Sequence, residues 1–173
     1  MQNRTTPTPV PPSDRIGVAE LRDVGLFGGL DDVVLQHLAS TLKVLKRGSE
    51  EVIFRDGDEA REFYVLLRGE VEVFKALKGG TEARLATLSP GHWFGETSML
   101  DVQPRSASVR ALSPCRLLVV TTRDLDALYR RDLKSYTLVV LNVARELSRR
   151  LRLVDELVAD FIGSVRNQHI GYG

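Results

Sequence analysis

The chain has 173 residues, 43% hydrophobic and 27% charged, which suffices for one compact domain with an additional element. Its 24 basic and 23 acidic residues leave a formal net charge of +1, which excludes the strongly basic footprint of a whole-domain nucleic-acid binder. The single cysteine, Cys115, excludes an intramolecular disulfide, and no long apolar window predicts a membrane span. Since the N-terminus also lacks a secretory signal pattern, we expect a cytoplasmic protein.

The first 45 residues divide into a proline-rich stretch and a helical segment. Residues 1–16 hold four of the seven prolines among polar residues, which favours a disordered leader, with a short docking peptide as the alternative. In residues 17–45 apolar side chains recur every three to four positions, which predicts helix that stops at Gly48.

Residues 50–121 show a β pattern, in which short apolar stretches alternate with turn signals. Strands are expected at 51–54, 63–67, 71–75, 84–88, 106–112 and 115–120. We therefore predict a mainly β fold with flanking helices, a β-barrel of the double-stranded β-helix or jelly-roll kind.

Residues 122–166 return to helical periodicity. Mostly apolar side chains recur at alternating spacings of three and four residues from Thr137 to Val165. This spacing indicates the a/d seam of a coiled coil over about four heptads. Because one small barrel cannot cover such a seam, we expect a long helix at 133–166 that pairs with a second copy; packing onto its own barrel is the alternative. The predicted divisions are a leader (1–16), a barrel domain (17–132), this dimerisation helix and a tail (167–173). The dimer contacts are expected at Val140, Ala144, Leu147, Leu151, Val154 and Val158.

The segment 94–109 interrupts the β pattern and collects groups that suit an anion. Gly95 permits a close approach of the backbone, and residues 96–100 can form a short helical turn with free amides at its start. Arg105 offers a planar fork that matches two phosphate oxygens. A carboxylate at Glu96 would repel an anion unless hydroxyl groups donate to it, so a phosphorylated sugar satisfies both residues.

These residues resemble the phosphate-binding cassette of cyclic nucleotide-binding domains. That family includes catabolite activator proteins, regulatory subunits of cyclic-AMP-dependent kinase and cyclic-nucleotide-gated channels. The cassette pattern is present as Phe94-Gly95-Glu96 and, after it, Pro104-Arg105-Ser106-Ala107-Ser108-Val109. Two further family motifs occur in order, at 57–71 and at 88–96. The resemblance covers residues 18–160.

The resemblance implies a role for each matching residue. Arg105 would pair with the cyclic phosphate, and Glu96 would accept from the ribose 2′-hydroxyl. The amides of Gly95, Thr97, Ser98 and Ser106 would complete the phosphate site, and the Ser106 hydroxyl would reach the phosphate or the purine. Val73, Leu85 and Ala86 would line the base pocket, with Leu88 nearby.

The resemblance leaves the base open. Ser106 is compatible with cyclic AMP and with cyclic GMP, and we expect cyclic AMP as the ligand. Val154 and Asp155 stand where catabolite activators carry a Thr-Ser pair that contacts adenine, so Asp155 is a second hypothesis for a base contact.

The expected function is that of a regulatory receptor that transmits nucleotide binding through its C-terminal helix to a protein partner. No helix-turn-helix pattern follows that helix, so direct DNA binding is not expected, nor is membrane association. The three histidines lack metal-ligand spacing and no nucleophile has a base nearby in sequence, so we expect neither a metal nor an enzyme, and no cofactor. The alternatives are an interaction module with a vestigial pocket and a sensor of another anionic metabolite.

Overall fold

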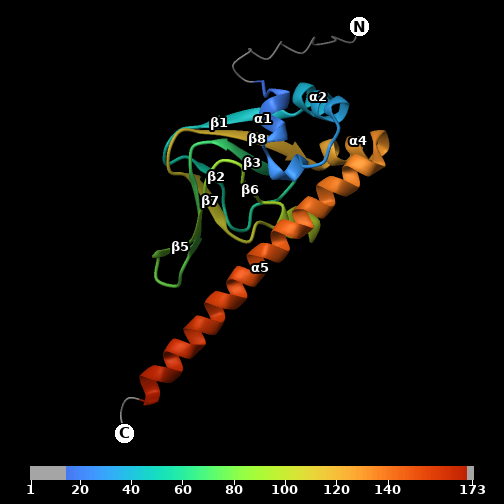
Figure 1. Cartoon of the computed structure of the whole chain (residues 1–173). Helices are drawn as coiled ribbons and strands as arrows, with labels where there is room; N and C mark the ends of the chain where they lie inside the picture. The colour runs from blue at the N-terminus through green and yellow to red at the C-terminus, as the bar shows by residue number, and fades with distance from the viewer. Residues whose placement is uncertain (1–14, 171–173) are drawn as a thin grey trace.

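Two antiparallel β-sheets form the centre of the fold, and helices from both ends of the chain pack around them (Figure 1). The computed structural model describes residues 15–170, with side chains described up to residue 163. The helices are α1 (Val18–Arg22), the 3-10 turn η2 (Gly25–Phe27), α2 (Asp32–Thr41), α3 (Thr97–Leu100), α4 (Thr122–Arg131) and α5 (Leu133–Ile170). The strands are β1 (Lys43–Arg47), β2 (Val52–Phe54), β3 (Glu62–Arg68), β4 (Val71–Ala76), β5 (Glu82–Leu88), β6 (Trp93–Phe94), β7 (Ser108–Ala111) and β8 (Cys115–Thr121).

The strands do not close into the barrel that the sequence predicted. They form one sheet in the order β1-β8-β3-β6 and a second in the order β2-β7-β4-β5, and no ladder joins the two within residues 15–170. The edge strands β6 and β2 have only two and three residues, and the β2–β7 ladder shifts register. Because these edges are too short to carry hydrogen bonds around a barrel, the sheets meet through side chains as a jelly-roll-like sandwich.

The inner core of the sandwich takes side chains from both sheets. Leu66 and Leu117 of the first sheet pack with Val71, Val109 and Ala111 of the second, and all five are almost completely buried. Alternate residues of a strand point to opposite faces, so each strand contributes every second side chain to this core. Strand β4 departs from simple alternation, because Glu72 is also buried, at 2% exposed, where it pairs with Arg84 and Arg110.

A second apolar cluster covers the outer face of the first sheet. Phe63 and Val65 of β3 and Leu118 of β8 pack there against α1, η2, α2 and the first turns of α5. Ile16, assigned to the leader by the sequence, is buried in this cluster, so packing begins before residue 17. Residues 1–14 of the predicted leader lie outside the described residues.

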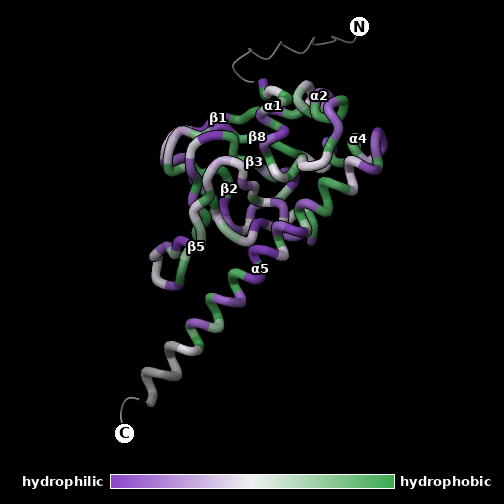
Figure 2. Tube along the Cα trace, viewed as in Figure 1, coloured by the Kyte–Doolittle hydropathy of each residue, from purple (hydrophilic) through white to green (hydrophobic). Residues whose placement is uncertain are grey.

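The last helix, α5, begins on the sandwich and continues well beyond it (Figures 1 and 2). The first half of α5 is bound to the segment around η2 by the buried Asn142 side chain, whose amide group donates to the carbonyls of Leu26 (3.1 Å) and Gly28 (3.0 Å). The helix begins at Leu133 and continues to Ile170, into the range expected as a tail, of which residues 171–173 are not described. Its distal part exposes apolar side chains, namely Leu151, Leu153, Val154, Leu157, Val158, Phe161 and Ile162. Among the described helices, none is both long and apolar enough to span a membrane.

Candidate ligand-binding site

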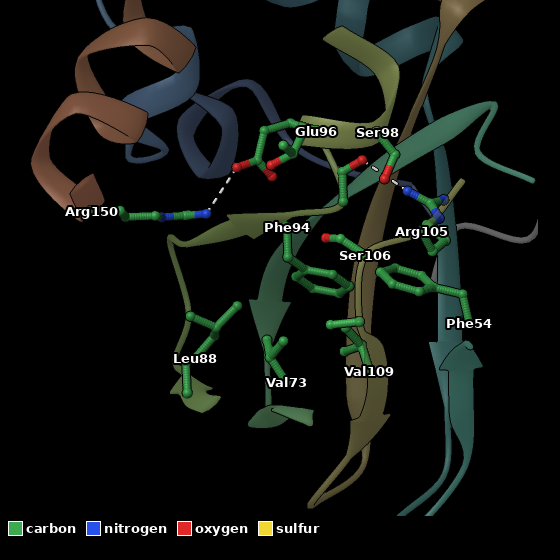
Figure 3. A pocket seen from close by; sticks show the side chains of 14 residues that line it. Phe54, Val73, Leu88, Phe94, Glu96, Ser98, Arg105, Ser106, Val109 and Arg150 are labelled. Carbon is green, nitrogen blue, oxygen red and sulfur yellow. Dashed lines mark hydrogen bonds and ion pairs between the residues drawn. The ribbon is translucent and has the colours of Figure 1, made fainter. Parts of the chain in front are cut away.

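A cavity of about 220 Å³ lies between the inner face of the second sheet, the loop around α3 and the side of α5. Figure 3 shows Glu96 and Arg150 on one side of it and Arg105 on the other, with apolar side chains below. The sequence-predicted residues that line it are Val73, Ala86, Gly95, Glu96, Thr97, Ser98, Arg105 and Ser106. They are joined by Phe54, Leu88, Phe94, Ala107, Val109 and Arg150.

Leu85 is the predicted site residue that the structure does not bring to the cavity. Its side chain is 58% exposed. The β4–β5 ladder pairs Val73 with Ala86 and Phe74 with Arg84, so a register shift leaves Leu85 without a partner on β4. Because neighbouring residues of a strand face opposite sides, Ala86 takes the inward position and Leu85 points away.

The backbone of Arg105 is held by the turn between β2 and β3. The Gly57 amide donates to the Arg105 carbonyl (2.8 Å), and the Arg105 amide donates to the Asp58 carbonyl (2.9 Å). The Asp58 carboxylate in turn accepts from the Arg55 amide at 2.8 Å, which closes the turn. The glycine–aspartate motif at 57–58 therefore acts on the site by positioning Arg105.

The Arg105 guanidinium is buried and only partly hydrogen-bonded. It donates through Nη1 to the Gly95 carbonyl (2.8 Å) and through Nη2 to the Glu62 carbonyl (2.7 Å). Its carbon lies 4.1 Å from the centre of the Phe54 ring, a cation–π contact. Burial lowers the pKa of this guanidinium, although nearby Tyr64 and Glu62 oppose the shift. Nε is buried without a hydrogen-bond partner, so the group keeps donor capacity for an anion.

Gly95 is required by the close packing of this loop. Its φ of +85° lies in the left-handed region that favours glycine. A Cβ at this position would lie 2.6 Å from Nη1 of Arg105 and 3.3 Å from Cε1 of Phe54. Any side chain here would displace the guanidinium.

Glu96 is the buried acid of the site, and α5 supplies its counter-ion. The Glu96 side chain is 2% exposed, and its Oε1 accepts from Nη1 of Arg150 at 2.8 Å. Arg150 also donates to the Trp93 carbonyl (2.6 Å) and to Glu146 (3.2 Å). Burial raises the pKa of the Glu96 carboxyl, and the Arg150 charge acts against that rise. The second carboxylate oxygen, Oε2, is buried without a hydrogen-bond partner.

The hydroxyl residues of the cassette divide into structural and accessible groups. Ser98 is buried, and its hydroxyl donates to the Pro104 carbonyl at 3.3 Å, which closes the loop. Thr97 is exposed at the first turn of α3, where the amides have no earlier helical carbonyl to bind. Ser106 is exposed and its carbonyl accepts from Lys75 at 3.1 Å. The site thus offers amides and a hydroxyl beside the buried Arg105.

A family model described as the cyclic nucleotide-binding domain matches residues 43–132, about half of the chain. The chain belongs to this family. The cyclic AMP receptor protein of Thermus thermophilus is 43% identical over 103 residues, which are 60% of this chain and 46% of that protein. A cAMP-dependent protein kinase regulatory subunit of Blastocladiella emersonii is 32% identical over 97 residues, 56% of this chain and 24% of that one. The chain therefore spans less than half the length of these two relatives.

A solved structure shares the fold. The cyclic nucleotide-binding domain from Methylobacillus flagellatus superposes with a TM-score of 0.75 at 24% identity, and the match covers 83% of each chain. At this identity the likeness concerns the arrangement of strands and helices alone.

Two contacts of this nucleotide-binding domain were missed by the sequence analysis. Arg150 lies one helical turn before Val154, a position already associated with the base, so its place on the same helix face was a usable signal. Phe54 gave no signal, because nothing in a short strand pattern shows that its ring will stack on Arg105. Val154 and Asp155 themselves do not line the cavity.

Proposed function

We propose that this domain is a regulatory receptor for a cyclic nucleotide, with cyclic AMP as the ligand in preference to cyclic GMP. The observation that carries the proposal is a pair of buried polar atoms without partners, Nε of Arg105 and Oε2 of Glu96, in residues that line one cavity. Buried polar groups are nearly always hydrogen-bonded. A ligand that accepts at Arg105 and donates to Glu96 satisfies both, and a cyclic phosphate joined to a ribose hydroxyl has this chemistry.

The remaining lining residues support a nucleotide in one orientation. The phosphate binds Arg105 and the amides of Gly95, Thr97, Ser98 and Ser106, and the ribose 2′-hydroxyl donates to Glu96. The base then lies against the apolar wall formed by Val73, Ala86 and Leu88. Leu85 has no part in this arrangement.

Ligand binding is proposed to reach α5 through Glu96. The same carboxylate that would bind the ribose is paired with Arg150, which belongs to α5. A ligand shifts a conformational equilibrium only by binding the two states differently. Here the differential interaction is the altered hydrogen bonding of Glu96, which changes how strongly the sandwich binds α5.

The output of this movement is proposed to be a homodimer that presents a changed surface to a downstream protein in the cytoplasm. The proximal seam residue Leu147 packs on its own sandwich. Leu151, Val154 and Val158 are more than half exposed, which leaves the distal seam for a second copy. No step of this function requires catalysis or a metal.

Isothermal titration calorimetry with cyclic AMP, cyclic GMP and 5′-AMP tests the proposal. The expected result is binding of a cyclic nucleotide, with a loss of about tenfold or more in affinity for Arg105→Lys, which keeps the charge and loses the fork. The matched control Arg152→Lys, on the exposed side of α5, should bind as the parent protein does. Absence of binding to ligand-free, folded protein would contradict the proposal and favour the interaction-module or other-metabolite alternatives.

A further inference from the structure

The first half of α5 packs on the sandwich, and it also carries an exposed face without charged side chains. Successive residues of an α-helix lie about 100° apart around the helix axis. Five exposed, uncharged residues therefore fall within an arc of about 60° along about five turns, namely Leu133, Thr137, Ala144, Ser148 and Leu151. We call these five residues the uncharged stripe. The exposed charged residues of the same stretch lie outside this arc, namely Lys134, Arg145 and Arg149.

Residues 100–103, which we call the cassette tip, expose two apolar side chains at the end of α3. Leu100 is 53% exposed and Val102 is 85% exposed. Val102 also has φ +55°, a backbone conformation that is unfavourable for a β-branched residue. Neither side chain belongs to the two apolar clusters formed within residues 15–163. Packing within the described part of the chain therefore does not account for an apolar, strained tip.

A small apolar hollow of about 30 Å³ brings the cassette tip to the side of α5. Met99 and Leu100 line it from α3, and Val139, Val140 and Val143 line it from α5. Around the helix axis Val140 lies between Val143 and the uncharged stripe, about 20° from the edge of the stripe. The cassette tip and the stripe therefore occupy neighbouring sides of α5.

The uncharged stripe suits a second copy of α5. Its side chains are small or apolar, and interaxial distances between packed helices are about 8–10 Å, depending on the side chains at the contact. The stripe also continues through Leu151 into Val154 and Val158, where the homodimer is proposed to form. The two-fold symmetry of a homodimer brings the same surface of both copies together. A helix on the stripe lies beside α3, so the cassette tip faces its flank.

We propose that the cassette tip of each protomer packs through Leu100 and Val102 against α5 of the second copy. This inference rests on the proposed homodimer and adds the nucleotide-binding loop to its interface. Helix α3 begins at Thr97, directly after Glu96, so a nucleotide that orders the cassette also changes a contact between the two copies. Because such coupling is reciprocal, cyclic AMP changes the dimer affinity by the factor by which dimerisation changes the affinity for cyclic AMP.

Sedimentation equilibrium of the full chain, with and without cyclic AMP, tests the proposal. Leu100→Asp and Val102→Asp should each weaken the dimer by about tenfold or more, because a buried apolar contact is replaced by a charge. Aspartate tolerates the left-handed conformation better than valine, so Val102→Asp should keep the fold, which circular dichroism checks. The matched controls Leu85→Asp and Val33→Asp change residues that are 58% and 68% exposed on β5 and α2. They should leave the dimer affinity within about twofold.

The outcomes separate this contact from the rest of the account. A parent protein that is monomeric with and without cyclic AMP would contradict the homodimer and this inference together. A dimer that Leu100→Asp and Val102→Asp weaken no more than the controls do would overturn this inference alone. A parent dimer whose affinity is the same with cyclic AMP bound as without it would overturn the coupling. The substitutions are also compared without nucleotide, so failure of cyclic AMP to bind would contradict the receptor function and leave the contact itself tested.

Discussion

Replacing Arg150 with methionine removes the counter-ion of a buried acid while keeping an unbranched side chain on α5. Loss of a hydrogen bond to a charged group costs about 1.5–3 kcal/mol, and breaking a fully buried ion pair about 3–5 kcal/mol. Glu96 is 2% exposed but Arg150 is 32% exposed. Because water partly screens this pair, we expect a loss of about 2 kcal/mol in the free energy of unfolding.

A double-mutant cycle isolates the pair from the other contacts of Arg150. The bond to the Trp93 carbonyl is lost in either background, whereas the Glu96 charge is absent once Glu96 is replaced by glutamine. Arg150→Met should therefore cost about 1 kcal/mol less in the Glu96→Gln protein than in the parent. Equal costs in both backgrounds would refute the coupling between α5 and the site.

The deficit of Arg150→Met should also depend on pH. Burial raises the folded-state pKa of Glu96, and Arg150 limits that rise. When the pKa of a carboxyl group is higher in the folded state than in the unfolded state, its contribution to stability is complete below the unfolded-state pKa, near pH ~4.3. That contribution is lost as the pH rises through the folded-state pKa. Without Arg150 the folded pKa rises further, so the loss of stability extends to higher pH.

Urea unfolding followed by tryptophan fluorescence at pH 7 and pH 4.5 measures both effects. The stability deficit of Arg150→Met should be larger at pH 7 than at pH 4.5. The matched control Arg152→Met, two residues along the same helix and exposed, should show a small deficit at both values. A deficit that does not change with pH would contradict a role for the Glu96 charge.

Three further predictions concern the backbone and the start of α5. Gly95→Ala should destabilise the protein by about 2 kcal/mol more than Gly57→Ala in urea unfolding, because both glycines have positive φ but only the Cβ at Gly95 meets other atoms; equal losses would refute this. Val102 has φ +55° and is 85% exposed, so Val102→Gly should stabilise by about 0.5 kcal/mol, measured in the same way, and a loss would contradict the strain. The Ser135 amide lowers the pKa of Asp132. The Asp132 carboxylate therefore contributes to stability above pH ~4, and this contribution is lost on acidification. The difference in melting temperature between Asp132→Asn and the parent should shrink from pH 7 to pH 3.

The contacts that sequence reasoning recovered are local in the chain. Gly95, Glu96 and Arg105 lie within one short segment. Their side-chain chemistry alone predicts a ligand that carries both an anionic group and a hydroxyl group. The structure places all three on one cavity. Their roles toward a ligand remain predictions.

The features that sequence reasoning missed depend on distant pairing. Arg150 reaches Glu96 from 54 residues further along the chain, and only the packing angle of α5 brings them together. Leu85 points away because of a register shift between β4 and β5, which alternation alone does not reveal. The open sandwich follows from the shortness of β2 and β6, whose pairing depends on neighbours elsewhere in the sequence.

The most direct test of the central claim compares cyclic AMP with 2′-deoxy-cyclic AMP by titration calorimetry, in the parent protein and in Glu96→Gln. The account predicts that the parent binds cyclic AMP and loses about tenfold or more in affinity without the 2′-hydroxyl, and that Glu96→Gln loses most of this discrimination. Equal affinity of the parent for both nucleotides, or no binding of either, would contradict it.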